Sequence, residues 1–104
     1  MNLSEKEIKL YKQEVCELTQ LLHSEWTEMK EILTQKIDVE DSYLCFYLEG
    51  EEDDEYGVIL TKDAEVYEFE IIDGKLDSIN KQNKDDIKED VPQVNIALEI
   101  QKKK

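Results

Sequence analysis

The chain has 104 residues, of which 27 are acidic and 13 are basic, so its formal net charge is −14. This length fits a single domain, residues 1–104, built around one hydrophobic core. The excess of acid argues against direct binding to nucleic acid or to an anionic membrane surface, since both require Lys and Arg. No apolar run approaches the roughly 20 residues of a membrane span, and the first residues lack the apolar centre of a signal peptide. We therefore expect a cytoplasmic protein.

The first third of the sequence predicts one long helix, residues 4–36. Ser4 and Glu7 form a capping-box pattern at its start. Apolar residues then recur every three or four positions, which is the period of one helix face, and no Gly or Pro interrupts them. Such a helix would be on the order of 50 Å long, more than a small domain spans, so a kink near Ser24 or a partner that covers one end stays open. The apolar positions are Ile8, Tyr11, Val15, Leu18, Leu22, Trp26, Met29, Leu33 and Ile37.

Four segments after this helix have the features of β-strands. Residues 42–49, 56–62 and 65–72 are rich in aromatic and β-branched residues, and the third of them alternates between apolar and acidic side chains. Asp73-Gly74 is a strong hairpin signal, so residues 75–79 are expected to return as a short fourth strand.

The C-terminal quarter is the least clear part of the sequence. Residues 80–90 are polar and indicate a loop or a weak helix. After Pro92, apolar and polar residues alternate over eight positions, which predicts a strand at 93–101, with a helix beginning at Pro92 as the alternative. The basic tail, 102–104, is expected to be frayed. The predicted fold is α+β, with the N-terminal helix packed on a mostly antiparallel, meandering sheet of about four or five strands.

No catalytic set is apparent in the sequence. His23 is the only histidine, and the chain has no nucleophile motif, no HExxH motif and no Gly-rich phosphate loop. We expect His23 to have a surface or capping role. The chain is accordingly predicted to be no enzyme and to require no cofactor.

Metal binding and cysteine chemistry are also not predicted. A calcium loop of the EF-hand type that began at Glu49 would need Gly at its sixth position, where the chain has Asp54. Cys16 and Cys45 are far apart and form neither a CxxC motif nor a zinc spacing. They are expected to be reduced thiols, with a disulfide or a reactive thiol as the alternative.

The most informative feature is a run of eight carboxylates between Glu40 and Glu55 with no Lys or Arg among them. Charges of one sign at this density weaken a fold, so we expect them to meet a basic partner protein; a surface that only maintains solubility is the simpler alternative. Acids held on a rigid sheet can imitate the phosphates of DNA, and aromatic anchors would supply binding energy. Trp26 also borders the acidic segment in sequence, but its place in the helical stripe favours a core role. The predicted partner-binding residues are Glu49, Glu51, Glu52, Asp53, Asp54 and Glu55, with Glu68 and Glu70 on one face of the next strand and Tyr47 and Tyr56 as anchors.

Four dipeptides, Leu10-Tyr11, Glu25-Trp26, Phe46-Tyr47 and Glu55-Tyr56, carry a resemblance to a known family. Their order and spacing over residues 10–56 resemble those of the YezG-type immunity proteins, which include antidotes of secreted bacterial nuclease toxins. This resemblance implies an antitoxin that inhibits a nuclease by covering its basic nucleic-acid-binding surface. The alternative is a structural or adaptor module that assembles through its long amphipathic helix, with a homodimer as one form of that assembly.

Overall fold

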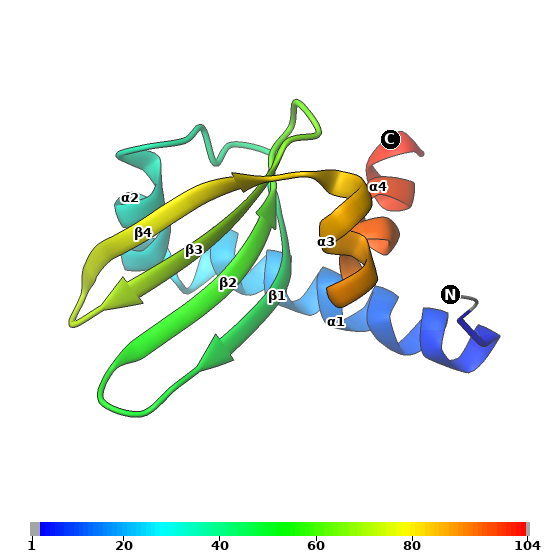
Figure 1. The fold of residues 1–104 in the computed structure, drawn as a ribbon, viewed down its shortest axis with the longest axis horizontal. Coiled ribbons are helices and arrows are strands. Elements are labelled where there is room, and N and C mark those ends of the chain that lie inside the picture. The colour runs from blue at the N-terminus through cyan, green and yellow to red at the C-terminus, as the bar shows by residue number, and fades with distance from the viewer. Residues whose placement is uncertain (1–2, 104) are drawn as a thin grey trace.

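The computed structural model describes residues 3–103 and has the predicted α+β fold (Figure 1). Its sheet is an antiparallel meander with the strand order β1-β2-β3-β4. Helices α1 and α2 lie behind the sheet in Figure 1, and α3 and α4 lie beside one end of it. The elements in chain order are α1 (Glu5–Ser24), α2 (Thr27–Thr34), β1 (Tyr43–Glu49), β2 (Asp54–Leu60), β3 (Val66–Ile72), β4 (Lys75–Gln82), α3 (Lys84–Asp90) and α4 (Gln93–Lys102).

The start of α1 confirms the predicted capping box. The Ser4 hydroxyl oxygen accepts a hydrogen bond from the Glu7 backbone N–H at 3.1 Å, and the Glu7 carboxylate accepts one from the Ser4 N–H at 3.2 Å. Two of the N–H groups that a helix N-terminus leaves unpaired are thereby satisfied.

The predicted helix over residues 4–36 is not continuous: α1 ends at Ser24, where the sequence left a kink open, and the chain leaves the helical path at Trp26 (φ −90°, ψ 53°). The backbone N–H groups of Glu25 and Trp26 both donate to the carbonyl of Leu21, at 2.9 and 2.8 Å. Just before the break, the Ser24 hydroxyl donates to the Gln20 carbonyl at 2.6 Å, a contact that competes with regular helix geometry. The longest dimension of the protein is 37 Å, so a straight helix of about 50 Å would have extended beyond the sheet.

The strand predicted at residues 93–101 is also wrong, since this segment forms α4. Pro92 occupies the N-cap position with a φ of −61°, which suits a helix start. Val94 and Leu98 are four residues apart on α4, and Ile96 and Ile100 form a second pair with the same spacing. Two helical pairs offset by two residues produce the same alternation as a strand, which explains the error.

Other boundaries differ by a few residues. β2 begins at Asp54, two residues before the predicted start, and β4 continues to Gln82 instead of ending at residue 79. Residues 84–90 are helical because the Asn83 side chain caps α3 and accepts hydrogen bonds from the next backbone N–H groups. Lys102 ends α4 and Lys103 is its C-cap residue, and residue 104 lies outside the described part; the frayed tail at 102–104 stays a prediction.

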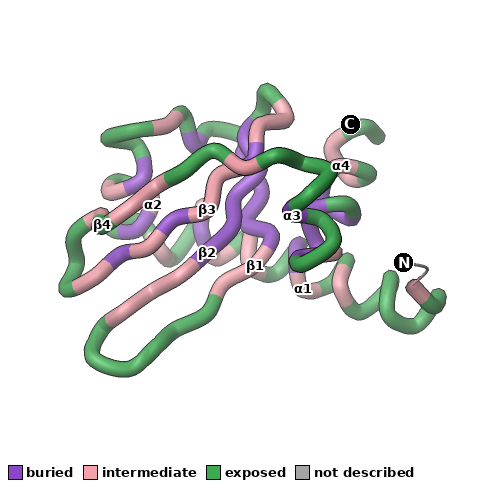
Figure 2. Tube along the Cα trace, viewed as in Figure 1, coloured by how far each residue is buried: buried purple, intermediate pink, exposed green. Residues whose placement is uncertain are grey.

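Both faces of the sheet are buried at its centre. Neighbouring residues Val58 and Ile59 point to opposite faces, and each is fully buried. Each face of the sheet has its own hydrophobic core, and α1 contributes to both. Val15 belongs to the first core, which contains Val58, and Leu22 belongs to the second core, which contains Ile59. Burial is concentrated where the sheet meets the helices, whereas the lower hairpin is exposed (Figure 2). The second core, which supports the candidate site, consists of Leu22, Met29, Leu33, Val39, Leu44, Ile59, Phe69 and Ile71.

Polar contacts attach α1 to the β1 edge of the sheet. The Thr19 hydroxyl oxygen accepts a hydrogen bond from the Leu44 N–H at 3.0 Å, and half-buried His23 donates through Nε2 to the Ser42 carbonyl at 2.9 Å. His23, for which the sequence predicted a surface or capping role, lies partly exposed in the last turn of α1 and joins this helix to the chain before β1. Both cysteines are free thiols; Cys16 is exposed, whereas burial raises the pKa of Cys45 to about 12.

Candidate partner-binding groove

The second part of the acidic run, residues 49–55, spans the turn between β1 and β2, and this turn is held in an unfavourable backbone conformation. Glu52 and Asp53 have φ angles of 58° and 63°, as in a type I′ turn. The Asp54 N–H donates to the Glu51 carbonyl at 3.3 Å and closes the turn. Side chains other than those of Gly, Asn and Asp rarely adopt this region, so Glu52 in particular is an unusual choice. Carboxylates occupy a position where Asn-Gly would fold more easily.

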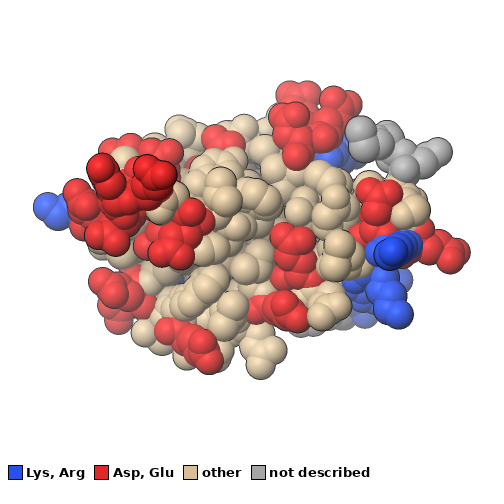
Figure 3. Space-filling view, turned by 90° about the horizontal axis from the view of Figure 1, so that it is seen from below, with Lys and Arg blue, Asp and Glu red and all other residues tan. Residues whose placement is uncertain are grey.

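The charge of this hairpin is not neutralised within the part of the chain that the structure describes. The three ion pairs found there join Lys62 to Asp38, Lys81 to Glu65 and Lys88 to Asp85, and none includes an acid of residues 49–55. Seen from below, carboxylates gather at the end of the molecule that carries the hairpin turns, while most basic side chains in this view lie at the other end (Figure 3).

The strand register divides the predicted partner-binding residues between the two faces of the sheet. Glu49 pairs with Glu55, and Tyr47 lies two residues before Glu49, so these three side chains share the face of the second core. Tyr56 pairs with Glu70, and Glu68 lies on the same side, which is the opposite face. Residues 51–53 lie in the turn that joins β1 to β2, and Asp54 is the first residue of β2. The predicted residues therefore lie close together at one end, but they do not form one flat surface.

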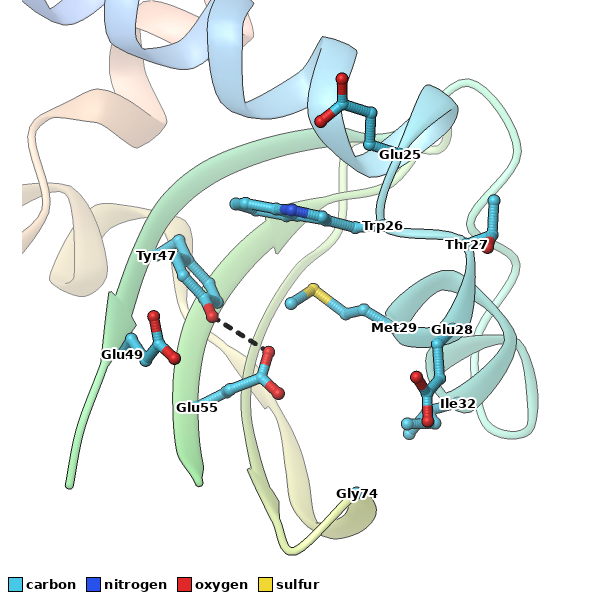
Figure 4. Close-up of a pocket in the computed structure, with 10 residues that line it drawn as sticks. All are labelled: Glu25, Trp26, Thr27, Glu28, Met29, Ile32, Tyr47, Glu49, Glu55 and Gly74. Carbon is cyan, nitrogen blue, oxygen red and sulfur yellow. Dashed lines mark hydrogen bonds between the residues drawn. The ribbon is translucent and has the colours of Figure 1, made fainter. Parts of the chain in front are cut away.

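A groove of about 460 Å³ lies between α2 and the β1–β2 face that bears Tyr47 (Figure 4). Trp26 and Tyr47 converge at its centre, Glu49 and Glu55 lie on the strand side, and Glu28 lies on the helix side. The wall is mixed, with apolar side chains from α2 and carboxylates from three elements. Its lining residues are Glu25, Trp26, Thr27, Glu28, Met29, Ile32, Tyr47, Glu49, Glu55 and Gly74.

Two half-buried aromatic rings define the middle of the groove. The ring centroids of Trp26 and Tyr47 are 4.7 Å apart, with an angle of 42° between the planes. The Tyr47 hydroxyl donates to Glu55 Oε2 at 3.1 Å, which fixes the position of that carboxylate. Partial burial, followed by the hydrogen bond to Glu55, raises the pKa of Tyr47 well above its usual range. The hydroxyl therefore remains a hydrogen-bond donor at neutral pH.

Glu49 and Glu55 face each other directly across β1 and β2. Side chains that pair in this way have Cβ atoms about 4.5–5.5 Å apart, and like charges in such pairs are destabilising. Four of the ten lining residues are carboxylates and none is basic. The groove therefore combines aromatic surface with negative charge that no Lys or Arg among its lining residues offsets.

The opposite face carries a second contact between an aromatic residue and an acid. The Tyr56 hydroxyl donates to Glu68 Oε2 at 2.6 Å, and the Tyr56 ring meets Phe46 edge-on with centroids 6.1 Å apart. Burial, the hydrogen bond to Glu68 and the charge of Asp90 raise the pKa of Tyr56. Nearby on β1, Leu48 is 57% exposed, so this face also presents apolar surface to solvent.

Sequence reasoning assigned Trp26 to the core and overlooked the residues that α2 contributes to the groove. Trp26 does contact the second core, but it also lines the groove. A signal in the sequence could have revealed the helix break that places Trp26 in the groove. Ser24 and Thr27 flank the pair Glu25-Trp26, and Ser and Thr are often found at helix ends.

Comparison with known proteins finds no matching family model, curated protein or solved structure. Within residues 3–103, no group of three or more His, Cys, Asp or Glu side chains is placed to hold a metal ion. No helix in the same range is long and apolar enough to cross a membrane. The geometry of the hairpin end and its groove is therefore the basis for the functional argument.

Proposed function

We propose that this chain is an acidic, non-catalytic inhibitor that binds a basic protein at its hairpin end. The partner class that fits best is a nuclease whose positive nucleic-acid-binding surface would be covered. In that role the chain would act as an immunity protein against a bacterial nuclease toxin, as its resemblance implies. The observation that carries the proposal is the concentration of carboxylates over residues 49–55 without a basic partner among the described residues.

Two features of the hairpin support a function outside the fold. Repulsion among its acids lowers stability, and the left-handed conformation of Glu52 lowers it further. Neither cost has a compensating ion pair among the described residues. A negative surface at one end of a protein would steer a basic partner toward it and can raise association rate constants to about 10⁸–10⁹ M⁻¹s⁻¹ at low salt.

The proposal is tested by capture from the native cell followed by an activity measurement. The immobilised protein is exposed to a cell extract at low salt, and bound proteins are eluted with a salt gradient. We expect the eluate to contain a basic nuclease whose cleavage of DNA or RNA stops when the free chain is added in equimolar amount. An eluate with no nuclease activity, or a nuclease that the chain leaves active, would refute the proposal.

A charge-reversal variant then tests whether the hairpin forms the contact. The variant E51K/E52K/D53K changes exposed turn residues, so the fold should persist. We expect its association rate constant to fall about 10- to 100-fold at low salt. The matched control E17K/E89K/E99K makes the same change in net charge at exposed positions outside the hairpin. An equal effect of both variants would show that only the overall charge matters and would exclude a hairpin contact.

Assembly through the N-terminal helix, the second candidate function, has less support. Ile8 and Leu10 on α1 are 41% and 60% exposed. They lie two positions apart on a helix, however, and so point to different sides and form no continuous apolar stripe. Val15 and Leu22, which belong to the predicted stripe, are buried within the fold. A dimer that persists in high salt would favour this function over the inhibitor, since salt does not screen apolar contacts.

A further inference from the structure

We propose that the groove between α2 and the β1–β2 face receives one arginine side chain of the partner. This inference deepens the proposed function and rests on it, because it assumes that the partner is a basic protein. In this proposal the guanidinium group donates hydrogen bonds to Glu49 and Glu55, and its flat face lies on the ring of Trp26.

The carboxylates of the groove are arranged for a cation with two or more donors. Glu49 and Glu55 pair directly across neighbouring strands, so both side chains leave the sheet on the same side. Glu55 already accepts one hydrogen bond from the Tyr47 hydroxyl at 3.1 Å, which orients it toward the groove (Figure 4). A cation placed between the two acids would turn a repulsive pair into an attractive one.

The aromatic pair adds a second, independent requirement on the ligand. Trp26 and Tyr47, with centroids 4.7 Å apart, give the groove an aromatic wall beside its acids. Cations bind over aromatic faces, and tryptophan is the strongest of these platforms. Because a guanidinium is planar, it can lie flat on a ring while its edge donates to carboxylates.

These features together favour arginine over lysine. The ammonium group of lysine is a compact, strongly hydrated charge, which gains less from a flat aromatic surface. The guanidinium group is more weakly hydrated and carries five donors in a fixed plane, and two facing carboxylates can accept several of them. A groove of about 460 Å³ is at the lower end of small-ligand sites and would hold a single side chain rather than a whole strand or helix.

The chain contains one tryptophan, so Trp26 is a specific probe of the groove. We would titrate the full protein with N-acetyl-arginine amide and follow the indole N–H signal of Trp26 by NMR. N-acetyl-lysine amide and N-acetyl-citrulline amide are the comparison ligands, since citrulline has the shape of arginine without its charge. We expect saturable shifts with a low-millimolar dissociation constant for arginine, several-fold weaker binding for lysine and no saturation for citrulline.

Variants locate the binding. E49Q/E55Q keeps side-chain size and removes both charges, so the arginine-induced shift should be lost while the unliganded spectrum remains that of a folded protein. The control E89Q/E99Q removes two charges at exposed positions on α3 and α4 and should bind arginine amide as the original protein does. Equal responses to arginine and citrulline, tighter binding of lysine, or saturable binding that survives E49Q/E55Q would each overturn the assignment.

The same variants separate this inference from the proposed function once a partner has been captured. If E51K/E52K/D53K slows association but E49Q/E55Q leaves the affinity unchanged, the arginine site is refuted and the inhibitor proposal stands. If arginine amide saturates the groove but no basic nuclease is captured, the inhibitor proposal is refuted and the cation-binding groove remains. If both hold, E49Q/E55Q should weaken partner binding at least about tenfold.

Discussion

The helix-covered part of the sheet and the β1–β2 hairpin are built on opposite principles. In the first, apolar side chains fill two cores, a capping box satisfies the start of α1, and no side-chain nitrogen or oxygen that is buried in the described residues lacks a hydrogen-bond partner. In the second, like charges face each other at Glu49 and Glu55, and Glu52 holds a left-handed backbone. The contrast indicates that the residues of the first region stabilise the fold, whereas the acidic residues of the hairpin do not.

The largest expected effect distinguishes the two regions along a single strand. Leu44 is fully buried in the second core, whereas Leu48, on the same strand, is 57% exposed. Leu44→Ala should lower the free energy of unfolding by about 2–5 kcal/mol, because it leaves a cavity in a packed core. The control Leu48→Ala should change it by less than about 0.5 kcal/mol. Urea unfolding followed by circular dichroism measures both, and a similar cost for the two variants would contradict the contrast.

The next effect concerns Gly57, which connects the core to the groove. A Cβ atom placed on Gly57 would lie 2.4 Å from the Phe69 ring, and that ring is 1% exposed and cannot move freely. Gly57 also pairs with Tyr47 on β1, so the close approach of Phe69 lies beneath the groove. Gly57→Ala should therefore cost about 1–3 kcal/mol of unfolding free energy through overpacking.

A matched control for this glycine lies at the other end of the hairpin. The nearest contact of a Cβ atom on Gly50 would be an ordinary 3.4 Å, with Asp54. Gly50→Ala should be neutral, or stabilising by up to about 1 kcal/mol, because it restricts the unfolded chain. If Gly57→Ala is as well tolerated as Gly50→Ala, the Phe69 ring does not need the space that this glycine leaves.

The fold could be predicted from sequence where a local signal matched its tertiary surroundings. The capping-box pattern of Ser4 and Glu7 predicted the start of α1, and Asp73-Gly74 predicted the turn before β4. The break after Ser24 was only one of two alternatives, because the apolar stripe continues through it in phase and cannot distinguish a kinked helix from a straight one. The Ser24 contact with Gln20 is local, whereas Trp26 packs on Tyr47, which is 21 positions away and could not be found from the sequence around the break.

The candidate site was predictable to the same limited extent. Tyr47 was predicted as an anchor because it borders the acidic segment, and Tyr47 and Glu49, two residues apart on a predicted strand, must share a face. The pairing of Glu49 with Glu55 depends on the turn register, and the α2 wall depends on the helix break. Neither of these is written in the local sequence.

The third effect compares the two hairpin turns, which differ in how well their residues suit them. The β3–β4 turn has Asp73-Gly74 at positive φ, a favoured pair, whereas the β1–β2 turn has Glu52-Asp53. Glu52→Asn with Asp53→Gly should raise the free energy of unfolding by about 1–2 kcal/mol through relief of strain and repulsion. Asp73→Asn, the control, should change it by less than about 0.5 kcal/mol. A double variant that is no more stable would show that the acidic turn does not weaken the fold.

The smallest effect examines the hydroxyl of Tyr47 in the groove. Burial and Glu55 raise its pKa above the usual value of about 10, so the neutral phenol is favoured in the folded state. Its contribution to stability is therefore fully present below about pH 10 and is lost as the pH rises beyond that value.

In the folded protein near pH 11, Tyr47→Phe should leave the phenolate absorbance unchanged, because Tyr47 is still protonated. In denaturant the same substitution should remove about one fifth of that absorbance, since the chain has five tyrosines. A loss in the folded protein as large, in absolute absorbance, as the loss in denaturant, with circular dichroism confirming the fold, would show that Tyr47 is solvated and that the groove does not hold Glu55 in place through this bond.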